Sequence, residues 1–66
     1  MGGAVKRDAY YLEEPTTGLY IVPGRAGNRL ATRHDATRYV SAQAAALDAS
    51  AHRVTEQAHE IVRVAA

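Results

Sequence analysis

The chain has 66 residues, a net charge of +1 and no cysteine. This length allows one small domain, which we place at residues 1–66, with residues 1–8 as a flexible N-terminus. The lack of cysteine excludes disulfides and thiolate metal sites, and the lack of a long apolar run argues against a membrane-spanning helix. Eight basic residues nearly balance seven acidic ones, which argues against a dedicated nucleic-acid-binding protein. The N-terminal segment has no apolar centre typical of a secretory signal, so we expect a cytoplasmic protein.

Residues 9–22 predict a β-hairpin. The first strand is expected at residues 9–14, and residues 19–22 (LYIV) are strongly strand-forming. Between them, residues 15–18 (PTTG) are typical of a turn, because proline fixes one backbone dihedral and glycine accepts a positive φ. The alternation does not decide which face of each strand meets the core.

Residues 23–33 are expected to leave the hairpin as an open loop. Gly24 and Gly27 suit a turn that needs positive φ. A phosphate-binding loop is disfavoured, because neither a GxGxxG nor a GK[ST] pattern is present and no clear helix follows. Residues 30–32 could add a short strand, and residues 35–38 could form one helical turn.

A helix is predicted from Ala42 to about Gln57. Ser41 can act as its N-cap, and Val40 can pack back onto it as a hydrophobic staple. Apolar residues recur at alternating spacings of four and three, as in a heptad, at Val40, Ala44, Leu47, Ala51, Val54, Ala58, Ile61 and Ala65. We expect this stripe to pack against a sheet.

Residues 59–64 allow two interpretations, and the choice between them sets the fold class. The heptad spacing favours one long C-terminal helix after the hairpin. The β-branched run of Ile61, Val62 and Val64 favours a strand instead, and a third strand would stabilise a hairpin that is marginal alone. We favour the strand, which predicts an α+β domain: a small antiparallel sheet of about three strands packed on one helix, in ββαβ order.

Three segments carry a resemblance to a known class of protein: YYLEEPTTGLYIV, DATRYVSAQAAAL and HEIVRV. Their order of hairpin, short turn, helix and strand resembles that of small single-domain proteins of phages and bacterial mobile elements, including some inhibitors of CRISPR surveillance complexes. The resemblance implies a protein-binding module in the cytoplasm of a bacterial host, which inhibits a host defence complex by occupying its surface. It is a likeness of elements and composition and carries no functional residue over.

Four closely spaced arginines are the candidate partner-binding residues. Arg25, Arg29, Arg33 and Arg38 lie in a window whose only acidic residue is Asp35. They would share one face of a helix or cluster in a loop. Because the guanidinium group is planar, it suits bidentate contact with carboxylates or phosphates. We expect it to meet an acidic surface of a larger host protein or complex; the alternative is a small nucleic-acid-binding protein that uses the same arginines.

No catalytic residue, metal site or cofactor is expected. Glu13 and Glu14 are neighbours on a predicted strand, so their carboxylates face opposite ways and cannot converge on one bond. One group of metal-binding residue types would gather only on a continuous helix, namely His52, Glu56, His59 and Glu60. We therefore predict a protein that is not an enzyme.

A chain this short has marginal stability on its own. The predicted sheet is expected to leave an edge strand exposed. Pairing of a second copy with that strand, as a homodimer, is our hypothesis for the missing support.

Overall fold

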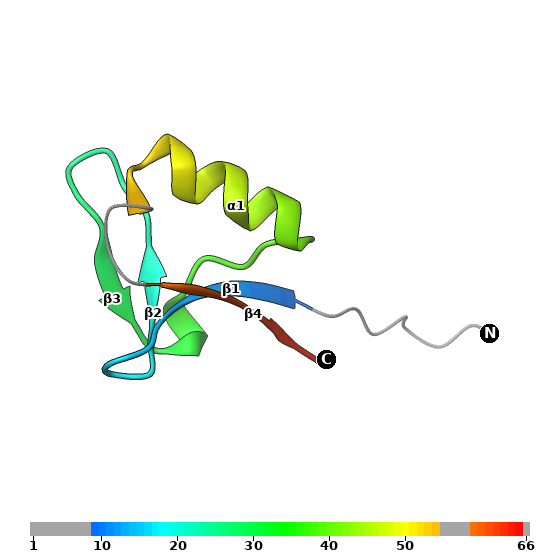
Figure 1. Cartoon of the computed structure of the whole chain (residues 1–66). Helices are drawn as coiled ribbons and strands as arrows, with labels where there is room; N and C mark the ends of the chain where they lie inside the picture. The colour runs from blue at the N-terminus through cyan, green and yellow to red at the C-terminus, as the bar shows by residue number, and fades with distance from the viewer. Residues whose placement is uncertain (1–8, 55–58, 66) are drawn as a thin grey trace.

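The computed structural model describes residues 9–54 and 59–65 and confirms an α+β domain, with a four-stranded antiparallel sheet and one helix (Figure 1). The expected flexible segment, residues 1–8, lies outside the described residues. The strand order is β3-β2-β1-β4. The elements in chain order are β1 Ala9–Glu14, β2 Leu19–Val22, β3 Arg29–Ala31, the 3-10 helix η1 Arg33–Asp35, α1 Ala42–Ala51 and β4 Glu60–Val64.

The C-terminal segment is a strand, as the β-branched residues predicted, and one long helix is ruled out. β4 pairs antiparallel with β1 from Ala9 opposite Val64 to Glu13 opposite Glu60. β1 therefore lies inside the sheet, between β2 and a strand from the other end of the chain. This pairing supplies the long-range contact that the hairpin lacks.

The first hairpin and its turn are confirmed. Residues 15–18 form the turn, and Gly18 takes a positive φ of 75°. The Glu14 carboxylate accepts hydrogen bonds from the backbone N–H of Thr16 at 2.8 Å and of Thr17 at 3.0 Å, and from the Thr17 hydroxyl at 2.8 Å. These bonds lower the pKa of Glu14, led by the backbone bond from Thr16.

The segment expected as an open loop instead closes a second hairpin. β3 pairs with β2 from Tyr20 opposite Ala31 to Val22 opposite Arg29, so the optional short strand is real and raises the count from about three strands to four. The expected helical turn at residues 35–38 occurs earlier, as η1. Residues 36–38 must leave the helical conformation because Tyr39 exchanges two backbone hydrogen bonds with Tyr10, at 2.9 and 3.0 Å.

The helix begins as expected but buries a different side. The Ser41 hydroxyl accepts from the Ala44 N–H at 3.0 Å, which confirms the N-cap. The predicted apolar stripe is wrong at two positions, because Val40 is 86% exposed and Leu47 is 65% exposed, so Val40 makes no buried staple. Two other members do pack inward, since Val54 lies in the core and Ala44 packs against it. The buried side carries Ala45 and Ala49, whose small side chains let the helix approach the sheet closely.

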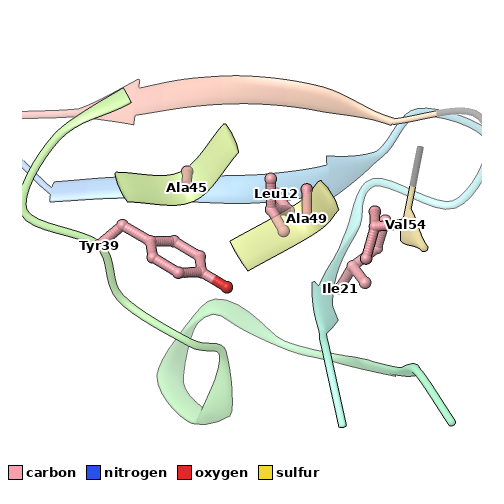
Figure 2. Packing of buried hydrophobic residues seen from close by; sticks show 6 residues of the cluster. All are labelled: Leu12, Ile21, Tyr39, Ala45, Ala49 and Val54. Carbon is pink, nitrogen blue, oxygen red and sulfur yellow. The ribbon is translucent and has the colours of Figure 1, made fainter. Parts of the chain in front are cut away.

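The core joins large side chains of the sheet to small ones of the helix (Figure 2). Leu12 of β1 and Ile21 of β2 are fully buried, as is Val54, which follows the helix. Each fully buried aliphatic side chain contributes about 2 kcal/mol. The cluster is completed by Tyr39, Ala45 and Ala49. The helix ends at Ala51 rather than near Gln57, and this early end brings Val54 down onto Ile21.

Candidate functional site

An open depression lies between the β2–β3 loop and the C-terminal end of α1, which Figure 1 shows side by side. Its volume is about 590 Å³. The loop contributes residues 24–28 and the helix end contributes residues 51–53. Two arginines, one histidine and one asparagine line it, and no acidic residue of the described ranges does.

The loop side of the depression is a tight turn. The Gly27 N–H donates to the Gly24 carbonyl oxygen at 3.1 Å, and Gly27 has a φ of 134°. A side chain at Gly24 would place its Cβ 2.9 Å from the Gly27 carbonyl oxygen. Both glycines are therefore explained by the turn.

Asn28 ties this loop to the helix end. Its side-chain oxygen accepts from the Gly24 N–H at 3.2 Å, and its side-chain amide donates to the His52 carbonyl oxygen at 3.2 Å. His52 is the C-cap residue of α1. Because both bonds converge on one half-buried side chain, the loop and the helix end are held as a unit.

A second set of polar side chains, from Tyr39 through Asp48 to His52, also contacts the helix end. The Tyr39 hydroxyl donates to the Asp48 carboxylate, whose other oxygen lies 3.1 Å from Nδ1 of His52. Burial raises the pKa of Tyr39, and the hydrogen bond and negative charge of Asp48 raise it further. Tyr39 therefore stays protonated and acts as a donor. His52 is thus contacted by Asp48 from the helix and by Asn28 from the loop.

The structure distributes the four predicted contact arginines over different elements. Arg25 lies in the loop and lines the depression, Arg29 begins β3 opposite Val22, and Arg33 lies in η1 beyond the other end of β3. Arg38 precedes Tyr39 in the segment that leads to the helix. All four are exposed, and neither a single helix face nor one loop contains them.

Arg53 was missed by the sequence analysis. It lines the depression opposite the loop that carries Arg25, because the helix ends two residues earlier in the chain. Arg53 has a positive φ of 59°, a conformation in which helices usually place glycine. Since no glycine marks this helix end, the sequence carried no signal that would bring Arg53 to the loop.

The described residues do not form the group of potential metal ligands that the sequence suggested around His52 and Glu60. His52 caps α1 and Glu60 begins β4, so the continuous helix it required is absent between them. Glu56 lies outside the described residues. Within residues 9–54 and 59–65, no group of three or more histidine, cysteine, aspartate or glutamate side chains is placed to hold a metal ion.

Comparisons with protein-family models, curated proteins and solved structures found no match for the chain. In the described part of the chain, no helix is long and apolar enough to cross a membrane.

Proposed function

We propose that this protein is a non-enzymatic protein-binding module, whose contact surface is the depression between the β2–β3 loop and the end of α1. One observation carries the proposal: Arg25 and Arg53 line the same open depression, and none of its lining residues within 9–54 and 59–65 is acidic. The partner is an acidic segment of a larger protein, whose carboxylates pair with the guanidinium group of Arg25.

The anchoring of the loop supports this function. Binding is weakened when a loop must be ordered on association, and an already ordered loop avoids that loss. The two hydrogen bonds of Asn28 hold the loop against the helix end before any partner arrives. The site therefore presents Arg25 at a defined distance from the helix end.

The remaining arginines rank by their distance along the chain from the depression. Arg29 directly follows Asn28, so it extends the contact surface at the same end of β3. Arg33 and Arg38 lie on separate elements and contribute less. We expect Arg25→Ala to weaken binding most, Arg29→Ala less, and Arg33→Ala least.

The test is an NMR titration of the full chain with a glutamate-rich peptide. Backbone amide shifts should concentrate at residues 24–29 and 51–53. Arg25→Ala should reduce the affinity by about tenfold, the loss of one charged hydrogen-bonded contact. Arg33→Ala is the matched control, because it removes the same charge away from the depression. Equal losses for both variants would reduce the effect to net charge and contradict the proposed site.

A nucleic-acid-binding protein is the rival function, and the same chain can be titrated with a DNA oligonucleotide. Phosphate binding by arginines weakens steeply with salt because counterions are released. Affinity for DNA at physiological salt, lost in Arg25→Ala and exceeding that for the peptide, would favour the rival. The low net charge of +1 supports the protein partner.

The partner that we propose is a host defence complex of CRISPR type, supported by the resemblance of the element order to phage and mobile-element inhibitors. Expression of the chain in a bacterium with active CRISPR interference should restore phage plating. The Arg25→Ala variant, expressed at the same level, should restore it less. If cells that express the native chain show unchanged CRISPR interference, this partner is excluded. The protein-binding proposal would then apply to a different partner.

We also propose self-association through an edge strand. The strand order leaves β3 and β4 at the two edges of the sheet. A second copy would enlarge a core in which the helix contributes mainly alanine.

A further inference from the structure

The two edges of the sheet differ in how far they are protected from pairing. β3 has three residues, and short edge strands are one means by which proteins avoid edge-to-edge association. β4 has five residues, pairs with β1 without a bulge and contains no proline. In the described part of the chain, nothing pairs with its outer edge. Of the two, β4 is therefore the edge that invites another strand.

We propose that β4 binds β4 of a second copy of this chain, antiparallel, about a two-fold axis that passes midway between the two copies of Val62. This specifies the self-association proposed above and rests on it. A two-fold axis perpendicular to the sheet keeps each face on its own side, so only residues of the same face can lie opposite one another. The axis must therefore lie midway between one residue of β4 and the same residue of the partner.

An axis at Val62 pairs every residue of β4 with a residue of the partner strand. Val62 lies opposite the partner's Val62, Glu60 lies opposite the partner's Val64, and Ile61 lies opposite the partner's Arg63. All five residues of β4 are then paired, and no like charges face each other. An axis through Arg63 would place two arginines directly opposite, which is unfavourable. An axis through Ile61 would leave two residues of each strand unpaired.

The position of the helix fits this arrangement. α1 contacts β1 and β4, so it lies toward the β4 edge of the sheet. Neighbouring strands lie about 4.8 Å apart. If α1 lies over the space between β1 and β4, the axis of α1 and that of the partner's helix would be two strand spacings, or about 10 Å, apart. Packed helices are typically about 8–10 Å apart, the shorter distances requiring small side chains.

The flank of α1 toward β4 carries such side chains. Tyr39 pairs with Tyr10 on the side of β1 away from β4, and its hydroxyl bonds to Asp48, so Asp48 marks the opposite flank of the helix. At about 100° per residue, the flank facing β4 holds Ala42, Ala46 and Ser50. All three are exposed in the single chain. Two copies would bring these small residues together.

The proposed β4–β4 interface also covers apolar surface that is exposed in the single chain. Ile61 is 37% exposed and shares the helix face of the sheet with its partner in register, Leu12. In the dimer, Ile61 would lie beneath both helices. On the other face, Val62 would meet its counterpart and extend the apolar patch that begins at Tyr11, while Val64 would lie opposite the partner's Glu60. An edge strand alone falls short of the about 800 Å² per partner of a stable interface, and the helix contact would enlarge the buried area.

The absence of cysteine in the chain makes a direct test possible. Opposed residues in antiparallel strands have Cα atoms about 4.5–5.5 Å apart, within the range that a disulfide bridges. Val62→Cys should therefore form a covalent dimer under mild oxidation. Val64→Cys is the matched control, because its two copies lie about 13 Å apart along the strands. Leu30→Cys tests the β3 edge.

Analytical ultracentrifugation of the native chain should show a dimer, and Val62→Lys should weaken it by about tenfold, because two charges then face each other at the axis. A monomer at high concentration would overturn both this interface and self-association. A dimer that crosslinks through Leu30→Cys and not Val62→Cys would overturn the β4 interface alone. If Val62→Cys unfolds by circular dichroism, a mixture of Glu60→Cys and Val64→Cys chains should crosslink instead. Arg25→Ala should leave the dimer unchanged, which separates this test from partner binding.

Discussion

The two hairpin loops of this sheet reach an ordered conformation in opposite ways. The β1–β2 loop is self-contained, because Glu14 accepts bonds from the residues two and three positions ahead. The β2–β3 loop depends on Asn28, which reaches a carbonyl oxygen 24 residues away at the helix end. A local turn can therefore form with the hairpin, whereas the anchored loop is completed only when the helix has packed. Arg25, the contact residue that we propose, lies in the anchored β2–β3 loop.

Removing the anchor should have the largest effect. Asn28→Ala deprives the Gly24 N–H and the His52 carbonyl oxygen of their partner, and we expect a loss of about 2 kcal/mol in the free energy of unfolding, measured by urea denaturation. It should also weaken peptide binding although no arginine changes. Asn28→Asp keeps the acceptor for Gly24 but faces His52 with an oxygen, so it should recover only part of the stability. Full stability in both variants would contradict the anchored loop.

Substitution of the loop glycines should have the next largest effect on stability, and it should distinguish the two loops. Gly27, with a φ of 134°, lies in a backbone region that residues with side chains rarely adopt, so Gly27→Ala should cost about 1–2 kcal/mol. Gly18, with a φ of 75°, is left-handed, and Gly18→Ala should cost about 1 kcal/mol. Asparagine tolerates the left-handed region, so Gly18→Asn should be nearly neutral and Gly27→Asn should not. Thermal unfolding of the four variants decides this.

The helix end behind the second loop should respond to its backbone strain. Arg53 has a φ of 59°, which costs a non-glycine residue about 1 kcal/mol. Arg53→Gly should therefore be about 1 kcal/mol more stable than Arg53→Ala, since both lack the side chain and differ only in the backbone preference. Equal stability of the two variants in urea denaturation would show that the helix ends in another conformation.

The smallest effect is expected in the self-contained loop. The pKa of Glu14 is lowered from its ordinary value of 4.5 by the bonds from Thr16 and Thr17. A carboxyl whose pKa is lower in the folded state stabilises the fold above 4.5, and this contribution is lost as the pH falls through the folded-state value. Glu14→Gln should flatten the stability profile slightly in that acidic window, and Glu13→Gln is the control. A steeper profile in Glu14→Gln would contradict the assignment.

The sequence predicted the local features of the fold well. The PTTG turn, the Ser41 cap and the β-branched strand at residues 60–64 each depend on residues close in the chain. The heptad stripe failed for a related reason. An alanine-rich helix has nearly the same apolar character all round, so periodicity could not tell the side of Ala45 and Ala49 from that of Leu47.

The candidate site was predicted only in part. Arg25 was singled out because arginines are concentrated around the loop, and it does line the depression. Arg53, His52 and the anchoring role of Asn28 could not be found, because they meet across the space between the loop and a helix end that no glycine marks. Arg33 was grouped with Arg25 by its spacing, and the antiparallel path of β3 takes it to the opposite end of that strand.

The sequence by itself determined the elements of this protein: two strands around a proline–glycine turn, a serine-capped helix and a β-branched strand at the C-terminal end. Neighbouring residues specify these through backbone dihedrals and side-chain shape. Only the tertiary structure decided which side of the helix is buried, which strand lies at the centre, and that Arg25 and Arg53 share one depression. Those outcomes depend on packing between residues that are distant in the chain. Alanine side chains let the helix approach the sheet closely, and the Asn28 side chain joins the loop to the helix end; the local sequence pattern specifies neither contact.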